Sequence, residues 1–377
     1  MKIGIDANEG NIKDKVGISE YVYELILEFS KLASVDRIFT IYLKRNQAED
    51  FPQEKSFWRY CIFGPKKFWT QFALPLKLFI NKDRPDVFFS PAHYAPRFSP
   101  VPTVISIMDL AFFHFPEYFT KKDLTQLHSW TSYSIKNAKA IITISEASKN
   151  DIIKFYQVSK EKIHVIYPGI KNKHMLEPHL YSLQKLQNTY QIPKNYILFV
   201  GTLQPRKNIN RLIEAFSKLL KEKGLPDDLS LVIVGKKGWK YEEILAAPEK
   251  YGVEDKVIFL DFVKNEDLQL LYEHAQVFAW PSLYEGFGLP VLEAMKYGCP
   301  VVTSNVSSLP EAGGDAALYV DPTKVDDIEK KMYKVLSDKK LRSDMIEKGK
   351  NHIKKFSWEN AAKQTLSVLE QVVHNSR

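Results

Sequence analysis

Cysteine and long apolar segments are both scarce in this chain of 377 residues. Only Cys61 and Cys299 are present, and they lie far apart in the sequence. This argues against a disulfide framework and favours a reducing compartment. No run approaches the ~18–20 apolar residues that a membrane-spanning helix needs, and the first residues do not resemble a signal peptide. We therefore expect a cytoplasmic protein, or one that lies on a membrane face without crossing it.

Several signatures of nucleotide and nucleic-acid binding are also missing. No Gly-Lys-Ser/Thr is present, which excludes a phosphate-loop NTPase. Gly286-Phe287-Gly288 lacks the third small residue of a dinucleotide fingerprint because Val291 occupies that position, which argues against a nicotinamide-dependent oxidoreductase. Zinc-finger spacing, an RNA-binding aromatic box and a basic-region helix are absent, so we expect no nucleic-acid partner.

Positive charge is concentrated in the first half of the chain. Residues 1–190 hold 26 Lys and Arg against 19 Asp and Glu, whereas residues 191–377 hold 27 against 26. This balance suggests an acidic partner, either an anionic membrane surface or a diphosphate-bearing acceptor. Residues 64–76 mix basic and aromatic side chains, as a segment at a membrane interface does. Because Pro75 interrupts that segment, we expect a core-facing helix there instead.

Short apolar runs alternate with helical patterns along the whole chain. Near-continuous Val, Ile and Phe runs are typical of a parallel sheet covered by helices on both faces. The rhythm restarts at Tyr196 after a polar, turn-rich connection over residues 174–193. We therefore predict an α/β protein with two doubly wound domains. The predicted strands are Lys2–Asp6, Ile38–Leu43, Val87–Ser90, Val104–Ile107, Ile141–Ile144, Ile163–Tyr167, Tyr196–Val200, Leu231–Val234, Val257–Leu260, Val277–Trp280 and Val301–Thr303, and helical runs are predicted at Ile18–Leu32 and Trp358–Val373.

The most informative stretch covers residues 281–295. Gly286 and Gly288 allow backbone angles closed to other residues and leave room for a ligand beside the chain. A proline in the first helical turn and Gly298 after the last turn predict a helix over about residues 290–297. Its amino end would point at the contents of the glycine loop. Such an end favours an anion, most simply a phosphate.

Two carboxylates accompany this loop. Glu285 lies before the predicted helix and Glu293 lies about one turn inside it. We expect both to line solvent on either side of the phosphate, where they would accept hydrogen bonds from sugar and ribose hydroxyls. The alternative is a surface glutamate on a loop together with a helix glutamate in an ordinary ion pair.

A second cluster of polar residues follows the predicted strand that ends at Val200. Ligands of open α/β sheets lie outside the carboxyl ends of the strands. Arg206 and Lys207 are placed there to meet phosphate oxygens. The alternative is solvated charge, but positive residues are electrostatically disfavoured where a helix starts. This conflict with the local rule favours a functional interpretation.

Glu285-Gly286-Phe287-Gly288-Leu289-Pro290, followed by Glu293-Ala294-Met295, resembles the glutamate-x7-glutamate motif of the family 4 retaining glycosyltransferases. The resemblance continues in Gly298-Cys299-Pro300-Val301 and covers nearly the whole chain. It implies the GT-B fold, with two Rossmann-like domains facing each other across a cleft. The implied division is an acceptor-side domain at 1–180, a nucleotide-sugar domain at 181–355, and a C-terminal helix at 356–377 that crosses back to the first domain.

The same resemblance implies a set of donor-binding residues. Arg206 and Lys207 become the diphosphate clamp, Glu285 holds sugar hydroxyls, and Glu293 holds the ribose. The loops that follow the second and third strands of the second domain flank the nucleobase, and a glycine in the first domain approaches the donor phosphate. The full set is Gly17, Arg206, Lys207, Gly235, Val263, Glu285, Gly286, Phe287, Gly288, Leu289 and Glu293.

The acceptor side carries fewer signals. Met108-Asp109-Leu110 resembles a His-Asp-Leu stretch of mannosyltransferase-like members, with methionine in place of the histidine. The change places more weight on Asp109 as the group that orients the acceptor hydroxyl or takes its proton. His93 could reach the same side, and the alternative is an ordinary polar loop residue. Residues 307–314 also match that branch, and we expect a turn and short helix that support the glycine loop.

The function that these resemblances imply is a retaining hexosyltransferase that works without a metal or cofactor. No Asp-x-Asp is present to hold the metal that other glycosyltransferases use. We expect Glu285, Asp109, Arg206 and Lys207 to carry catalysis, GDP-mannose as the first candidate donor, and a glycan or lipid-linked glycan as acceptor. The setting would be bacterial surface polysaccharide assembly at the inner face of the cytoplasmic membrane. The alternatives are a UDP-sugar transferase, a phosphorylase, an epimerase, or a basic binding protein without activity.

Overall fold

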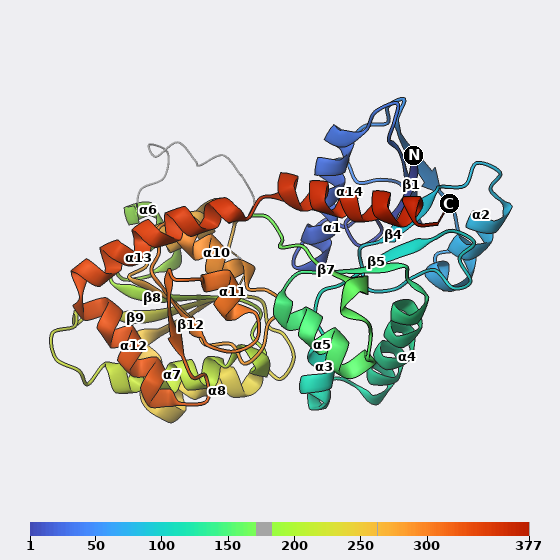
Figure 1. The fold of residues 1–377 in the computed structure, drawn as a ribbon. Coiled ribbons are helices and arrows are strands. Elements are labelled where there is room, and N and C mark those ends of the chain that lie inside the picture. The colour runs from blue at the N-terminus through green and yellow to red at the C-terminus, as the bar shows by residue number, and fades with distance from the viewer. Residues whose placement is uncertain (171–182, 262, 377) are drawn as a thin grey trace. The chain divides into compact units, whose positions relative to one another are not determined.

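The computed structural model describes residues 1–170, 183–261 and 263–376. The chain divides into two units with separate cores (Figure 1). Unit 1 consists of Met1–Gly169 together with the segment that starts at Phe356, and unit 2 covers Ile170–Lys355. The domain boundary expected at residue 180 falls in 171–182, outside the described residues.

Unit 1 is built on a parallel seven-stranded sheet in the order β3-β2-β1-β4-β5-β6-β7. All residues of β4, β5 and β6 are buried, as expected for strands covered on both faces. Six of these strands were predicted from their apolar runs, and β3 was not. The strands are β1 (Lys2–Asp6), β2 (Ile38–Leu43), β3 (Trp58–Ile62), β4 (Val87–Ser90), β5 (Thr103–Ile107), β6 (Ala140–Thr143) and β7 (Ile163–Val165).

Helices cover this sheet. The predicted helix at Ile18–Leu32 is confirmed as α1, which packs beside the C-terminal helix α14 (Figure 1). The Tyr21 and Trp358 rings meet edge to face at 5.7 Å, and Arg37 Nε donates to Glu370 Oε1 at 3.0 Å. The helical elements of unit 1 are α1 (Ile18–Leu32), η1 (Trp69–Ala73), α2 (Leu74–Ile80), α3 (Ala111–His114), η2 (Pro116–Tyr118), α4 (Lys121–Asn137), α5 (Glu146–Tyr156), η3 (Lys160–Lys162) and α14 (Trp358–His374).

Unit 2 repeats the plan with a parallel six-stranded sheet in the order β10-β9-β8-β11-β12-β13. Five of its strands were predicted, two of them one residue shorter than observed, and the edge strand β13 was not. Since β8 lies between β9 and β11, the loops that follow these three strands emerge side by side at one edge of the sheet. The strands are β8 (Tyr196–Val200), β9 (Ser230–Val234), β10 (Val257–Leu260), β11 (Val277–Trp280), β12 (Val301–Ser304) and β13 (Ala317–Val320).

The helices of unit 2 follow its strands in turn. Helix α7 is strongly amphipathic and buries six residues, including Leu212 and Phe216. The helical elements are α6 (Leu183–Tyr190), η4 (Pro205–Lys207), α7 (Ile209–Leu219), α8 (Glu242–Tyr251), η5 (Glu254–Lys256), α9 (Asn265–His274), α10 (Leu289–Lys296), α11 (Leu309–Gly313), α12 (Val325–Ser337), α13 (Lys339–His352) and η6 (Ile353–Lys355). Across the described ranges, none of the helices is both long and apolar enough to span a membrane.

The segment predicted as a core-facing helix at residues 64–76 is helical only from Trp69 onward, as η1 followed by α2. One face of it is buried, as expected, but the opposite face is exposed. Pro75 lies in the first turn of α2, where a proline does not break the helix. The expectation that the whole segment faces the core is therefore wrong for half of its surface.

Candidate active site

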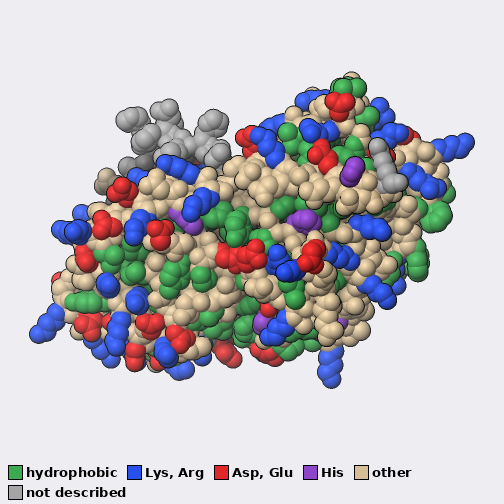
Figure 2. Space-filling model, in the orientation of Figure 1, with side chains coloured by type: hydrophobic (Ala, Val, Ile, Leu, Met, Phe, Trp, Pro, Cys, Tyr) green, Lys and Arg blue, Asp and Glu red, His purple; other side chains and the backbone are tan. Residues whose placement is uncertain are grey.

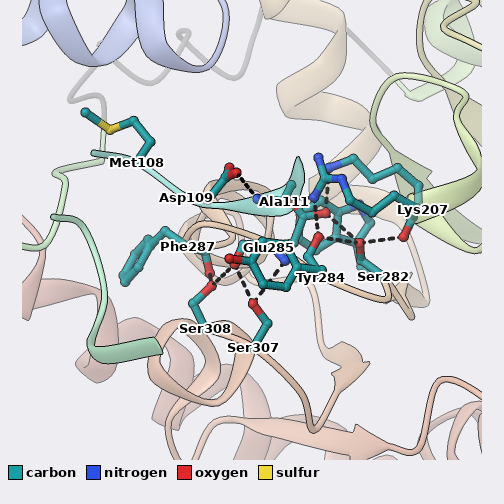
Figure 3. Close-up of polar contacts among 12 residues, drawn as sticks. Met108, Asp109, Ala111, Lys207, Ser282, Tyr284, Glu285, Phe287, Ser307 and Ser308 are labelled. Atoms are coloured by element: carbon teal, nitrogen blue, oxygen red, sulfur yellow. Dashed lines mark hydrogen bonds and ion pairs between the residues drawn. The ribbon is translucent and has the colours of Figure 1, made fainter. Parts of the chain in front are cut away.

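The central feature of unit 2 is a buried ion-pair cluster at the carboxyl edge of its sheet. Lys207 Nζ lies 2.6 Å from Glu285 Oε1, and Arg206 Nη1 lies 3.0 Å from Glu285 Oε2 (Figure 3). The two cations come from η4, which follows β8, and the carboxylate comes from the loop after β11. Adjacent parallel strands bring these segments together although they lie 78 residues apart. Two positive charges against one negative charge leave the cluster with a net charge of +1.

Glu285 is buried, with 7% of its surface exposed, which corrects the expectation of a solvent-lined glutamate. Burial by itself raises the pKa of this carboxyl. Lys207 and Arg206, aided by a hydrogen bond from Ser282 Oγ at 2.6 Å, outweigh burial and lower the pKa below its ordinary value. Glu285 is thus held as a carboxylate by the residues that were predicted to clamp a diphosphate.

The hydroxyls of Ser307 and Ser308 form hydrogen bonds with the backbone of the loop that carries Glu285. Ser307 Oγ donates to Glu285 O at 2.5 Å and accepts from Glu285 N at 3.1 Å. Ser308 Oγ, which is fully buried, shares its single proton between Glu285 O at 2.8 Å and Phe287 O at 2.9 Å (Figure 3). A short helix, α11, follows at once. The expectation that residues 307–314 support the glycine loop is confirmed by these contacts.

Lys207 has a second restraint. Its Nζ lies 4.5 Å from the centre of the Trp280 ring, a cation–π arrangement. Trp280 Nε1 in turn donates to Val200 O at 3.0 Å, which fixes the indole across the ends of β8 and β11. Asn208 Nδ2 donates to Pro281 O at 2.9 Å and so ties the two loops together again. The position of the Lys207 ammonium is therefore determined by residues at the ends of β8 and β11.

Helix α10 begins at Leu289, one residue earlier than predicted, and directly after Gly288. Gly288 has a φ of 116°, and a Cβ there would lie 2.9 Å from Leu309 Cδ2. At the other end, Gly298 has a φ of 72°, Gly298 N donates to Met295 O and Cys299 N donates to Ala294 O. These paired bonds close the helix as predicted. Gly286, Phe287 and Gly288 are buried beneath the amino end of α10.

Glu293 is not part of the ion-pair cluster. It is half-buried in α10, and Tyr272 Oη donates to its Oε2 at 3.2 Å. The Tyr272 and Tyr297 rings stack with their centres 5.9 Å apart. The two glutamates of the motif therefore occupy different environments, one among cations and one beside tyrosines.

Gly235 and Val263 follow β9 and β10 at the same sheet edge. A Cβ on Gly235 would lie 2.0 Å from Gly201 O, so close approach of two backbones requires glycine there. Val263 is buried, and its neighbour Phe262 lies outside the described residues. The predicted role of these two residues beside a nucleobase stays a prediction.

In unit 1, the predicted residues His93 and Asp109 follow the neighbouring strands β4 and β5. His93 has a φ of 73°, and its N donates to Ser106 O at 3.0 Å. Its Nε2 is buried and has no hydrogen-bond partner among the described atoms. Burial lowers the pKa of His93 to about 4, against the opposing effect of the Asp109 carboxylate. Asp109 Oδ1 accepts from Ala111 N at 2.9 Å, which fixes the carboxylate where α3 starts.

Gly17 directly precedes α1 and has a φ of 56° and ψ of −119°, a conformation that residues with a Cβ rarely adopt. A Cβ at this position would meet nothing within 4 Å, so the space beside the backbone is open. The approach of a ligand to this glycine stays a prediction.

Two polar residues at these sheet edges had no predicted role. Ser282 is fully buried and donates to Glu285, but a serine before a loop carries no distinctive sequence signal. Asp6 ends β1, and burial raises the pKa of its carboxyl to about 6 in spite of hydrogen bonds from Asn8. Asp6 could have been found from the sequence, because it stands at the carboxyl end of a predicted strand, where ligands of open α/β sheets bind. No cluster of three or more His, Cys, Asp and Glu that could hold a metal occurs in the parts of the chain that the structure covers.

Comparisons with known proteins agree with this arrangement. Residues 184–352 match the family Glycosyl transferases group 1, and residues 16–173 match Glycosyltransferase Family 4. O-antigen chain mannosyltransferase B of Escherichia coli is 35% identical over 267 residues, which cover 71% of this chain and 70% of that protein. The chain belongs to the family 4 glycosyltransferases and is therefore a transferase.

Solved structures extend the comparison to the whole fold. Sucrose-phosphate synthase from Thermosynechococcus elongatus aligns with a TM-score of 0.74 at 18% identity, over 99% of both chains. HepE from Anabaena, solved with UDP and glucose, aligns with a TM-score of 0.73 at 19% identity, over 98% of this chain and 100% of that one. The protein has the GT-B fold, with two Rossmann-like α/β units as predicted.

Proposed function

We propose that this protein is a retaining mannosyltransferase that moves mannose from GDP-mannose to a glycan or lipid-linked glycan acceptor, without a metal ion. The observation that carries the proposal is the buried Arg206–Lys207–Glu285 cluster at the amino end of α10, in a chain whose relative is an O-antigen chain mannosyltransferase. In this proposal the enzyme works at the inner face of the cytoplasmic membrane, in surface polysaccharide assembly.

The chemistry follows from where charge develops. Breaking the bond between sugar and phosphate increases the negative charge on the leaving diphosphate. Fixed positive groups stabilise such charge best when they need no reorganisation during the reaction. Arg206 and Lys207 are held in place by Glu285, Tyr284 and Trp280. The N–H groups at the start of α10 contribute further partial positive charge.

In this mechanism Glu285 has two tasks. It positions both cations, and from the same loop it holds the hydroxyls of the transferred sugar. Glu293, near Tyr272, accepts the hydroxyls of the ribose. On the acceptor side Asp109 orients the attacking hydroxyl or takes its proton, and the leaving phosphate is the alternative proton acceptor.

The donor is tested with the purified protein and a panel of nucleotide sugars. Release or transfer of labelled sugar is measured with GDP-mannose, UDP-glucose, UDP-galactose and ADP-glucose, and thermal stabilisation is measured with GDP, UDP and ADP. We expect GDP and GDP-mannose to give the largest effects. A preference for UDP or ADP would overturn the donor assignment, and turnover that depends on free phosphate would indicate a phosphorylase.

Retention is tested on the product. Nuclear magnetic resonance of the newly formed glycosidic linkage reports its anomeric configuration. We expect the α-configuration of the mannose in GDP-mannose to be kept. A β-linked product would exclude the retaining mechanism but leave the transferase assignment intact.

A further inference from the structure

An amphipathic segment of unit 1 has two apolar faces, of which only one is covered by protein. The segment consists of η1 and α2. Its inner face places Trp69, Leu74 and Leu78 in a buried cluster with Tyr42 and Phe88. This packing fixes the segment against the sheet, so the opposite face has a defined position.

The outer apolar face, here called the α2 face, consists of five exposed side chains. Their exposed fractions are 55% for Phe68, 70% for Phe72, 62% for Leu76, 55% for Phe79 and 67% for Ile80. Phe72, Leu76 and Ile80 recur at every fourth residue of η1 and α2, which aligns them along one side. Phe68 directly precedes η1, and its ring centre lies 6.2 Å from that of Phe72. Scattered exposed apolar residues are normal, but a contiguous row of this kind marks an interaction surface.

Positive charge surrounds this face. Residues 64–84 contain five cations and one acidic residue, Asp83, which is ion-paired with Lys2. Arg84 lies 5.7 Å from the Phe79 ring, and the Lys67 ammonium lies 5.4 Å from the Phe68 ring. Hydrophobic and basic side chains lie together at the right-hand edge of the molecule, where Figure 1 labels α2 (Figure 2). The cations are Lys66, Lys67, Lys77, Lys82 and Arg84.

We propose that the α2 face docks on the surface of an anionic lipid bilayer. The apolar row would enter the boundary between headgroups and acyl chains, and the lysines and Arg84 would contact lipid phosphates. Charge complementarity decides between this occupant and a second copy of the chain. Two copies meeting through this face would bring two sets of five cations together, whereas an anionic bilayer neutralises them.

The docking surface is independent of which sugar the enzyme transfers. It lies wholly on unit 1, and none of the predicted donor- or acceptor-binding residues belongs to it. Loss of docking and loss of transferase chemistry can therefore be measured separately. If the acceptor is a lipid-linked glycan, the same docking would bring the enzyme to the surface that presents it.

Vesicle flotation tests the proposal directly. The probes are vesicles of phosphatidylcholine alone and of phosphatidylcholine mixed equally with phosphatidylglycerol. We expect binding to the mixed vesicles, weaker binding at high salt, and little binding to phosphatidylcholine alone. No binding to the mixed vesicles, or equal binding to both kinds at every salt concentration, would overturn the proposal.

Two variants assign the binding to the α2 face. Phe72→Gln should lower the vesicle partition coefficient by about tenfold, since an aromatic side chain leaves the bilayer boundary. Val35→Gln is the matched control, because Val35 is also 70% exposed but lies outside the face. Lys66→Gln combined with Lys67→Gln should lower binding to mixed vesicles by roughly tenfold or more. Equal effects of Phe72→Gln and Val35→Gln would overturn the assignment.

The alternative occupant is tested on the protein without lipid. Light scattering during gel filtration measures the molar mass of the wild type and of Phe72→Gln. We expect the same mass for both, and the same thermal unfolding midpoint, because Phe72 is exposed. A wild-type dimer that dissociates in Phe72→Gln would show that the α2 face joins two copies and would overturn membrane docking.

Discussion

The carboxylate of Glu285 is ion-paired with two cations, and this determines what its loss should do. Without that charge, the buried Lys207 and the half-buried Arg206 each lose an anionic partner. In the proposed clamp, a nucleoside diphosphate brings negative charge to the same cations. Glu285 therefore influences ligand binding as well as stability, and the two effects have opposite signs.

Replacement of Glu285 by Gln should lower stability by about 3 kcal/mol, the range for a broken buried pair, and should reduce transfer sharply. Affinity for free nucleoside diphosphate should be kept or increased. Glu293→Gln should weaken that affinity, because a ribose carboxylate acts with or without a sugar attached. Isothermal titration and thermal unfolding measure both. Equal losses of nucleoside diphosphate affinity in the two variants would contradict this division.

The ion pairs of Glu285 with Lys207 and Arg206 also predict how stability depends on pH. The pKa of Glu285 is lowered in the folded protein, so its contribution is complete above the ordinary glutamate range and disappears as the pH falls through the folded-state pKa. The free energies of unfolding of the wild type and of Glu285→Gln should therefore become equal at acid pH.

Lys207→Ala and Arg206→Ala should each weaken binding of the cognate nucleoside diphosphate. A charge-assisted contact to phosphate contributes about 1.5–3 kcal/mol, or roughly ten- to a hundredfold in affinity. Lys207→Ala should also lower stability, since Lys207 is buried. Isothermal titration measures the first effect and thermal unfolding the second. Lys218→Ala is the control, because Lys218 forms an exposed ion pair with Asp326 in the same unit. Unchanged affinity in both test variants would remove the clamp assignment.

His93 supplies a prediction for unit 1. Its pKa is lowered to about 4, so the folded protein keeps it neutral while the unfolded chain binds a proton below the ordinary value of 6.5. Stability should therefore fall as the pH drops from about 6.5 to 4, by at most about 1.4 kcal/mol per pH unit from this group.

The test variant is His93→Asn, because Asn tolerates the positive φ at this position. Denaturant unfolding across the same pH range should give a flatter profile than the wild type. His374→Asn, at the exposed end of α14, should leave the profile unchanged. A profile in His93→Asn as steep as in the wild type would show that His93 does not titrate with folding.

At the scale of elements, the strands with continuous apolar runs could be predicted, whereas two of the four edge strands, β3 and β13, could not. In strand β3 only Trp58 is buried, and the inner pair of β13 is only half-buried. Both lie at the edge of their sheets, where solvent replaces one neighbour and the apolar signal weakens. The exposed side of α2 was missed for a different reason, since Pro75 was expected to interrupt the segment but lies in the first turn of α2.

The candidate site could also be predicted only in part. Motif and strand order could place Arg206, Lys207 and Glu285 at one sheet edge. The burial of Glu285 and its direct pairing with both cations depend on side-chain contacts between segments 78 residues apart. No local pattern encodes such a contact, and the expected solvent-lined glutamate was wrong for that reason.

The glycine loop depends on a neighbouring element, and Ser308→Ala tests this. The substitution removes the hydroxyl proton that the carbonyls of Glu285 and Phe287 share, and it should lower stability by about 1–3 kcal/mol. It should also raise the KM for the donor more than it lowers kcat, because the loop loses its support before ligand binds. Steady-state kinetics measure both constants.

Ser134→Ala is the matched control for that substitution. Ser134 is equally buried and also forms two hydrogen bonds, but it lies on α4 in unit 1. It should lower stability by a similar amount and leave the KM for the donor unchanged. If both variants raise KM equally, the effect reflects stability rather than support of the loop.

At the scale of the whole molecule, two groups of cations suit different partners. In unit 2, the ion-paired Arg206 and Lys207 lie at the sheet edge formed by β8 and β11, where we propose that they bind a diphosphate. In unit 1, positive charge is exposed around the α2 face, where it suits an extended anionic surface. The net charge of +8 therefore does not describe a uniformly basic protein. Salt should weaken vesicle binding far more than nucleotide binding, because buried pairs are screened less than exposed charges.

Metal independence is the last prediction, and it concerns the complete enzyme. In the proposed mechanism, Arg206, Lys207 and the amino end of α10 stabilise the charge that develops on the leaving diphosphate, a task that a divalent ion performs in other enzymes. Sugar transfer should therefore survive exhaustive EDTA treatment followed by gel filtration, with kcat unchanged. Lys207→Ala treated in the same way separates two explanations. If Mg²⁺ restores activity to that variant alone, the ion replaces a missing protein cation. If EDTA abolishes wild-type activity and Mg²⁺ restores it, the diphosphate requires a metal, and the proposed mechanism is wrong.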